Sequence, residues 1–357
     1  MQQDTKRDCT GQQVYVGLDV SQTHWLVSIH TAAGEYKTFH QQPEVEPLIG
    51  YLHRTFPHGQ YHAVYEAGYC GFWIYEQLRQ RGIDCVVVNP ADVPTRDKEH
   101  AHKTDPVDAR KLARGLRTGE LDALYVPSRL CQEHRSLVRL RQTMVRKQTR
   151  CKNQIKAHLS FYGIDVPEAV ATTHWSRAYI GWLEQTALHC HHSGTVVLQT
   201  LLSELQSLRG TIATVTKYIR QLALNEPYKD AIGYLRTIDG ISILSGMIFL
   251  TEIVDIERFG NTDRLASYCG IVPGEYSSGN RTIVTGMLHR GNTALRTMLI
   301  ECAWVAIRTD PALKQAFAQL NKRQAKAKAI VHIARKLLNR MYFVLKHRQA
   351  YRPCAVG

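Results

Sequence analysis

The first 119 residues alternate between short apolar runs and amphipathic segments, and this order restricts the fold more than any other feature of the chain. Residues 14–20, VYVGLDV, form an apolar run rich in β-branched residues, which is the pattern of a buried strand. Residues 25–30 and 35–39 predict two further strands, joined by a TAAG turn. The three runs together predict an antiparallel meander at the start of a domain.

The segments that follow alternate between helix and strand. We predict a helix at 44–56, a strand at 62–67, a helix at 71–82, a strand at 85–90 and a helix at 103–119. Gly and Pro residues mark the ends of these helices and of the last strand. The resulting order, βββαβαβα, predicts a mixed α/β layered domain.

The rest of the chain has the pattern of long helices, and 357 residues are too many for one typical domain of about 100–200 residues. Residues 131–164 hold eight Lys or Arg against one acid along an intermittent apolar seam, which predicts a long basic helix. Helices continue over 175–222 with a break at the HSG of 192–194, and 195–222 is long enough for a helical hairpin or coiled coil. We therefore predict an α/β domain at 1–125, a basic helical or coiled-coil connector at 126–225, and a mainly helical domain at 226–357.

The charge of the chain restricts its partners. Lys and Arg total 45 against 31 Asp and Glu, and a net charge of +14 favours a polyanion, either nucleic acid or an anionic membrane face. No apolar run reaches the ~20 residues of a membrane helix, and the polar N-terminus lacks the apolar centre of a signal peptide. The nine cysteines show no C-x-x-C spacing, which argues against a disulfide framework or a zinc ribbon. These patterns predict a soluble intracellular protein with no membrane partner.

Four acids stand out by their positions. Asp19 lies at the end of the first strand, Glu66 lies at the end of a later strand, and Asp105 and Asp108 share one face of a helix. If the strands are neighbours and the helix packs across them, the four carboxylates converge, and their mutual repulsion calls for a divalent metal. Mg²⁺, or Mn²⁺, prefers carboxylate oxygens and keeps water and substrate phosphates as further ligands. Two such ions can hold both sides of a scissile phosphodiester.

Each acid also has a structural explanation. Asp19, two residues before Ser21, can cap a turn, and Glu66 can be an exposed strand end. The stretch Asp105-Pro-Val-Asp108 has the pattern of a helix start, with acids near the positive end of the helix dipole. The order of the four acids on a βββαβαβα frame favours the metal site, because it is the ribonuclease-H-like arrangement.

Residues 237–253, TIDGISILSGMIFLTEI, resemble a helix–Gly hairpin–helix, a motif whose hairpin presents backbone N–H groups to a DNA phosphate. An ordinary tight turn between helices explains this segment equally well. Residues 308–352 then form a helical part with twelve Lys or Arg against one acid.

The stretch from Tyr276 to Asn280, YSSGN, precedes a basic run punctuated by glycine. Gly274, Gly279, Gly286 and Gly291 predict a loop-rich surface, and the cations that can gather there around a phosphate are Arg281, His289, Arg290 and Arg296. A serine that attacks a phosphodiester forms a phosphoserine ester, which allows rejoining without ATP, but it needs a base or a metal for activation. On the residues alone, hydrogen bonding of Ser277 and Ser278 within a turn is the stronger explanation, and Tyr276 is a rival nucleophile.

Five motifs, in this order along the whole chain, resemble a known family. VYVGLDVSQ, VYEAGYCG, KTDPVDARKLA, LASYCGIVPGEYSSG and HRGNTALR look like the insertion-sequence transposases that join a DEDD-type, RuvC-like domain to a C-terminal serine domain. These are the bridge-RNA-guided recombinases and the related DNA invertases. The resemblance implies that Asp19, Glu66, Asp105 and Asp108 bind metal and that Ser278 is the nucleophile. The family usually has a second Gly soon after the Ser-Gly, whereas Asn280 and Arg281 follow here.

The resemblance further implies a transposase or site-specific recombinase of a mobile element, acting on double-stranded DNA in the bacterial cytoplasm at the nucleoid. It implies a structured noncoding guide RNA and a dimer or tetramer in which the serine of one protomer works with the acids of another. We expect the following basic residues to contact nucleic acid: Arg139, Arg146, Lys147, Arg150, Arg281, Arg290 and Arg296. The alternatives are a RuvC-like nuclease or junction resolvase in which Ser278 is only structural, and a nucleic-acid-binding protein without catalysis.

Overall fold

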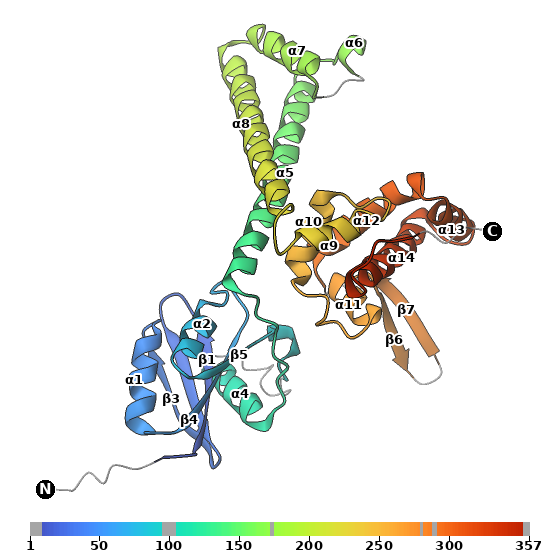
Figure 1. Ribbon diagram of the computed structural model, residues 1–357. Helices are drawn as coiled ribbons and strands as arrows, with labels where there is room; N and C mark the ends of the chain where they lie inside the picture. The colour runs from blue at the N-terminus through green and yellow to red at the C-terminus, as the bar shows by residue number, and fades with distance from the viewer. Residues whose placement is uncertain (1–8, 95–104, 172–174, 279–280, 288–290, 353–357) are drawn as a thin grey trace, which may run out of the picture. The chain divides into compact units, whose positions relative to one another are not determined.

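The computed structural model describes residues 9–94, 105–171, 175–278, 281–287 and 291–352. Contacts within the chain divide it into two compact units, Met1–Pro127 and Ser128–Gly357, which are described separately below (Figure 1). None of the described helices is both long and apolar enough to cross a membrane.

A mixed five-stranded sheet forms the centre of the first unit. Its strands are β1 (Gln13–Val20), β2 (Trp25–Thr31), β3 (Gly34–Gln41), β4 (Gln60–Glu66) and β5 (Asp84–Val88). Their order in the sheet is β3-β2-β1-β4-β5. The first three strands are the predicted antiparallel meander, whereas β4 and β5 run parallel to β1. Parallel neighbours need a crossover connection, which α1 (Val45–Thr55) and α2 (Trp73–Gln80) supply.

The two faces of this sheet are covered by different helices. Val14, Val16 and Leu18 of β1 are fully buried in one core cluster with apolar residues of α1 and α2. Alternate residues of a strand point to opposite faces, and on the other face Val64 packs with Leu112 of α4 (Asp105–Thr118). The observed order of elements agrees with the predicted βββαβαβα, with a short 3₁₀ helix at Pro90–Asp92 added.

The first part of the second unit contains two long helices that pack along each other, α5 (Arg129–Phe161) and α8 (His192–Leu222). Two shorter helices, α6 (Glu168–Ala171) and α7 (Arg177–Leu188), connect them in the chain. Cys151, Ile155 and Leu159 of α5 form one core cluster with a leucine series on α8. The predicted break at 192–194 is wrong, because these residues form the first turn of α8. Residues 195–222 are one continuous helix and not a hairpin, since α5 supplies the apolar partner surface.

The remaining helices of the second unit enclose a separate core. They are α9 (Lys229–Leu235), α10 (Ile243–Ile253), α11 (Thr262–Cys269), α12 (Thr293–Thr309), α13 (Pro311–Asn321) and α14 (Lys326–Lys346). Ile333, Leu337 and Met341 of α14 are fully buried in this core. The connector predicted at 126–225 stays a prediction, since the whole of 128–357 groups as one unit.

Between α11 and α12 the chain forms an antiparallel pair of strands, β6 (Pro273–Ser278) and β7 (Arg281–Met287). The prediction of a loop-rich surface was therefore wrong for most of this segment. The glycines at 274 and 286 lie within the strands, and the run RTIVT is rich in the β-branched residues that favour strand pairing. We call the segment Pro273–Met287 the serine hairpin.

Candidate active site

Asp19 and Glu66 lie at the same end of two neighbouring parallel strands. Leu18 of β1 is paired with Tyr65 of β4, and the two acids each follow one residue later. Both acids are half-buried. The carboxyl ends of β1 and β4 thus present two carboxylates at adjacent positions.

Both acids face the side of the sheet that α4 covers. Side chains two residues apart in a strand point to the same face, so Asp19 shares the face of Gly17 and Glu66 shares the face of Val64. Gly17 lies directly beneath α4, because a Cβ placed there would be 2.2 Å from the carbonyl oxygen of Ala109. Val64 contacts the same helix in its own core cluster.

The N-terminus of α4 lies toward the acid-bearing end of β1. His30, which is paired with Tyr15 in the first half of β1, is affected more strongly by the charges of Arg117 and Arg114, near the end of α4, than by the charge of Arg110, nearer its start. The helix therefore runs opposite to the strand. Two strand residues span about 6.6 Å, which equals about four helix residues at 1.5 Å each. Counting back four residues from Ala109 leads to the first turn of α4, where Asp105 and Asp108 lie.

The described acids share an edge and a face, but they are not gathered around a common point. Among the residues whose side chains are described, no three His, Cys, Asp or Glu are close enough to hold a metal ion together. Asp105 begins α4, and its side chain lies outside the described residues. The donor set fits a divalent ion in kind, since carboxylate oxygens are the ligands of Mg²⁺ and Mn²⁺.

Two residues at this edge were missed by the sequence reasoning. The ammonium of Lys111, whose side chain is only 8% exposed, lies 3.4 Å from Oδ1 of Asp108. The only signal for it was the i, i+3 spacing from Asp108 on the predicted helix. Tyr69 lies in the loop after β4. Desolvation and the charges of Cys70 and Asp19 raise the pKa of the Tyr69 hydroxyl, which indicates that Tyr69 lies near Asp19. Tyr69 is 63% exposed, so it can contact a ligand at this edge.

The predicted nucleophile lies at the end of β6. Ser278 is paired with Arg281 and Ser277 with Thr282 across the serine hairpin. The side chains of Ser278, Arg281 and Arg290 lie outside the described residues, so the roles predicted for them stay predictions.

Comparisons with known proteins match both regions. Residues 16–164 match a family model of DEDD transposases, described as "Transposase", and residues 233–318 match the model of the "Transposase IS116/IS110/IS902 family". The chain belongs to the IS110/IS116 transposase family. Membership makes it an insertion-sequence transposase, an enzyme class that cuts and rejoins DNA, and the DEDD domain is consistent with a ribonuclease-H-like fold and with dependence on a divalent metal.

The relatives of the transposase extend over most of its length. A putative transposase of Sinorhizobium fredii, y4qE, is 28% identical over 94% of this chain and 83% of its own. A second one from the same strain, y4rJ, is 28% identical over 91% of this chain and 90% of its own. The transposase for insertion sequence element IS1111A of Coxiella burnetii is 25% identical over 78% of this chain and 76% of its own.

The basic residues of α5 in the transposase fall into two groups. Arg146, Lys147 and Arg150 are exposed, as expected for contacts to phosphate. Arg139 is also exposed in part, but its guanidinium donates to both carboxylate oxygens of Glu252, at 2.6 and 2.7 Å. The charge of Arg139 is therefore already paired within the protein, and its predicted contact with nucleic acid stays a prediction.

Arg296 lies half-buried in the first turn of α12 of the transposase. Only the second half of the predicted helix–Gly hairpin–helix at 237–253 is helical: α10 covers its residues 243–253, whereas α9 ends at Leu235, before the segment begins. Ser242 caps α10, with its hydroxyl accepting from the backbone N–H of Ser245 at 3.1 Å, so the protein itself occupies this donor. This favours the reading of the segment as an ordinary packed turn.

Proposed function

We propose that this transposase cuts and rejoins the DNA of its insertion sequence through a phosphoserine intermediate on Ser278, assisted by a divalent metal held by Asp19, Glu66, Asp105 and Asp108. The observation that carries the proposal is the placement of Asp19 and Glu66 at adjacent strand ends on the face covered by α4, whose first turn bears the other two acids. The serine lies apart from this edge in the chain, at the end of β6. The proposal includes that the serine of one protomer works with the metal site of another.

The proposed reaction exchanges one phosphate ester for another. The Ser278 oxygen attacks the scissile phosphorus, the Oγ–P bond forms, and the bond from phosphorus to the leaving sugar oxygen breaks. The hydroxyl proton of the serine passes to a neighbouring base or solvent, and the leaving sugar oxygen takes up a proton. In the joining step a sugar hydroxyl of the new strand attacks the phosphoserine and restores the serine hydroxyl. Because every step exchanges one P–O bond for another, no nucleotide hydrolysis is needed.

The acids and their neighbours would hold and orient this chemistry. A divalent ion bound by the four carboxylates would neutralise charge on the phosphate and lower the pKa of the attacking hydroxyl. Lys111 holds Asp108 by an ion pair and so restrains one of the proposed ligands at the start of α4. Tyr69, exposed beside Asp19, would contact the substrate backbone.

The proposal also includes two partners: a guide RNA, and further copies of the chain in a dimer or tetramer. A net charge of +14 and the exposed cations of α5 support a partner with many phosphates. Base pairing by the RNA would then select the target and donor DNA, and the protein would bind backbone and shape.

A metal-dependent nuclease or junction resolvase is the second candidate. It is favoured by one observation: the unit that carries Asp19 and Glu66 has its own complete core and does not contain Ser278. In that case water attacks the phosphorus, and no covalent protein–DNA species forms.

The serine decides between the two candidates. The full chain is incubated with Mg²⁺, a supercoiled plasmid that carries the element with its flanks, and RNA transcribed from those flanks. Covalent protein–DNA adducts are then counted on a denaturing gel. We expect Ser278→Ala to abolish both the adduct and strand joining, and the neighbouring Ser277→Ala, a matched control, to retain them. Normal strand exchange by Ser278→Ala would refute the phosphoserine mechanism, whereas metal-dependent cleavage without adduct or strand joining, equal in the wild type and Ser278→Ala, would favour the nuclease.

A further inference from the structure

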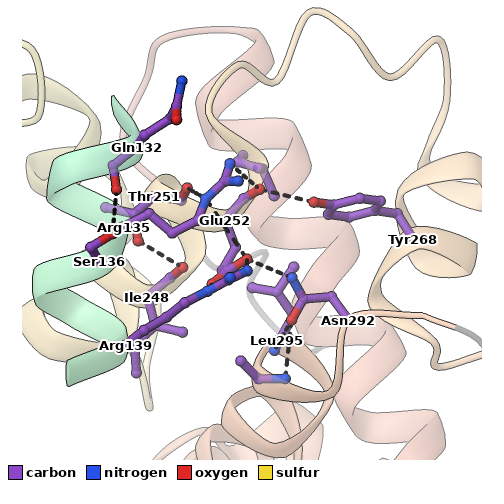
Figure 2. A network of polar contacts seen from close by, with 12 residues as sticks. Gln132, Arg135, Ser136, Arg139, Ile248, Thr251, Glu252, Tyr268, Asn292 and Leu295 are labelled. Carbon is purple, nitrogen blue, oxygen red and sulfur yellow. Dashed lines mark hydrogen bonds and ion pairs between the residues drawn. The ribbon is translucent and has the colours of Figure 1, made fainter. Parts of the chain in front are cut away.

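Glu252, the penultimate residue of α10, is a buried carboxylate in the second unit. Its side chain is 2% exposed, and a buried charge is costly unless other groups pair with it and hydrogen-bond to it. Oε1 accepts from Nε of Arg139 at 2.6 Å, and Oε2 accepts from a second guanidinium nitrogen of Arg139 at 2.7 Å and from Nδ2 of Asn292 at 2.7 Å. Figure 2 shows these donors converging on the carboxylate from opposite sides.

The backbone at the end of α10 takes part in the same network. Arg135 of α5 donates from Nε to the carbonyl oxygen of Thr251 at 2.8 Å, and the Tyr268 hydroxyl of α11 donates to the carbonyl oxygen of Glu252 at 3.0 Å (Figure 2). The last carbonyls of a helix have no partner within the helix, and cations are favourable there. The end of α10 is thereby held by α5 on one side and by α11 on the other.

Asn292 links this network to the serine hairpin. Its side-chain oxygen caps α12 by accepting from the backbone N–H groups of Ala294 and Leu295, at 3.0 and 3.1 Å. Its own N–H donates to the carbonyl oxygen of Tyr268 at 2.8 Å. The amide Nδ2 donates to Glu252, so the side chain of Asn292 joins α10 to the start of α12, and its backbone N–H adds the contact to α11.

The two ends of the segment that contains the hairpin meet beside Asn292. Gly291 has a φ of +115°, and a Cβ on it would lie 2.6 Å from Cα of Gly270, the residue that ends α11. Residues 270 and 291 are thus in backbone contact at the base of the serine hairpin. Any shift of Asn292 would move one of these two ends relative to the other.

We propose that Glu252 is a positioning residue: it fixes the base of the serine hairpin to the basic helix α5, through Asn292 on one side and Arg139 on the other. A bidentate carboxylate–guanidinium pair restricts direction as well as distance. A buried ion pair often adds little stability over an apolar replacement. We therefore infer that the pair of Glu252 and Arg139 serves to fix the position of α10 relative to α5. Arg139 lies seven residues before Arg146, which places both on one face of α5. Nucleic acid bound along that face would be held at a set position relative to the hairpin. The proposal rests on the function proposed for Ser278.

The test compares Glu252→Gln and Asn292→Ser with the wild type. Glu252→Gln keeps the shape of the side chain but removes its charge and one acceptor. Asn292→Ser keeps a good cap for α12 and removes only the amide that donates to Glu252. Glu301→Gln is the matched control, since Glu301 is an exposed acid of α12 outside the network. Each full-length variant is assayed for adduct formation with the element plasmid and flank RNA, for DNA affinity, and for hydrogen exchange without nucleic acid.

We expect both network variants to form the adduct between about 10- and 100-fold more slowly at saturating DNA, because small displacements of a reacting group carry losses of that size. DNA affinity should stay unchanged, and amide exchange should rise at residues 291–292 and in the hairpin strands, while Glu301→Gln behaves as the wild type. Wild-type rates in Asn292→Ser, or slower rates explained by weaker DNA binding alone, would overturn the positioning role. If Glu252→Gln fails to fold, Asn292→Ser decides by itself.

Ser278→Ala, run in parallel, separates the two proposals. Loss of the adduct in Ser278→Ala with normal adduct in Asn292→Ser refutes only the positioning role. Normal DNA strand exchange in Ser278→Ala refutes the proposed function, whatever amide hydrogen exchange shows about the hairpin.

Discussion

Gly17 of β1 and Ala109 of α4 are in direct backbone contact, since a Cβ on Gly17 would lie 2.2 Å from the carbonyl oxygen of Ala109 and 2.5 Å from the amide nitrogen of Ala113. No flexible side chain can move aside at this contact, because both neighbouring atoms belong to the helix backbone. The contact sets how closely the first turn of α4, with two of the four acids, approaches the strand that ends in Asp19.

Gly17→Ala should therefore destabilise the first unit. Forcing a methyl group between β1 and α4 should cost about 1–3 kcal/mol, the usual penalty for overpacking a core. Equilibrium urea unfolding followed by tryptophan fluorescence measures the effect. The matched control is Gly50→Ala in α1, where no atom lies within 4 Å of an added Cβ. That change should stabilise by about 0.5–1 kcal/mol, because alanine favours a helix interior. An unchanged midpoint for Gly17→Ala would contradict the close packing of α4 on β1.

Asp19→Asn should remove metal-dependent cleavage. The proposed ion contributes several kcal/mol of charge stabilisation, and each 1.36 kcal/mol is tenfold in rate, so we expect a loss of about 100-fold or more. The measurement is plasmid cleavage as a function of Mg²⁺ and Mn²⁺ concentration. Asp84→Asn makes the same chemical change at the start of β5, where an exposed carboxylate pairs with Arg79, and should leave cleavage intact. Full activity of Asp19→Asn at low Mg²⁺ would rule Asp19 out as a ligand.

The exposed cations of α5 predict a particular salt dependence of binding. Arg146, Lys147 and Arg150 lie within two turns of one helix. If each contacts a phosphate, replacing all three by Gln should lower the slope of log K against log salt by about 2–3, at roughly 0.7–0.9 per contact. Affinity for flank RNA and for a short duplex, measured over a salt series, gives this slope.

The control for that experiment removes the same charge from other exposed positions of the second unit, namely Arg177, Lys229 and Arg236. These substitutions should change the overall affinity slightly and leave the slope near that of the wild type. Equal slopes for both triple variants would mean that net charge alone, and not the face of α5, attracts the nucleic acid.

His30 should make the stability of the first unit depend on pH. It is 6% exposed, and neither ring nitrogen has a hydrogen-bond partner among the described residues. Burial lowers the pKa of His30 below 6.5; the charge of Glu35 acts in the opposite direction, and the charges of Arg117, Arg114 and Arg110 lower it further. Below pH 6.5 the unfolded chain thus binds a proton that the folded chain does not. Stability is complete above that pH and falls as the pH decreases, by at most about 1.4 kcal/mol per unit.

His30→Phe keeps a planar ring but removes the titrating group. Urea unfolding of this variant and the wild type between pH 8 and pH 5 tests whether His30 causes the pH dependence. The variant should lose the part of the pH dependence that begins near 6.5. His53→Phe, an exposed position of α1, should keep it. If the free energy of unfolding varied with pH in the same way in the wild type and His30→Phe, His30 would not be the cause of the pH dependence.

The amino-acid sequence by itself determined the order of the elements in the first unit. Strand and helix periods depend on residues that are neighbours in the chain, so VYVGLDV and the strand ending at Glu66 could be recognised without the structure. The same local signals placed Asp19 and Glu66 at strand ends. The serine hairpin was harder to recognise, because its glycines indicate loops while the β-branched residues between them favour strands.

Only the tertiary structure decided which charges meet. Arg139 and Glu252 are 113 residues apart, and nothing in the local pattern of α5 separates Arg139 from its exposed neighbour Arg146. Their pairing depends on how α5 and α10 pack, which is a property of distant surfaces that fit together. The same holds for Gly17, whose missing side chain has a purpose only once α4 lies against it. Local periodicity thus orders the elements and locates the acids, whereas close packing between distant elements sets the distances on which the chemistry depends.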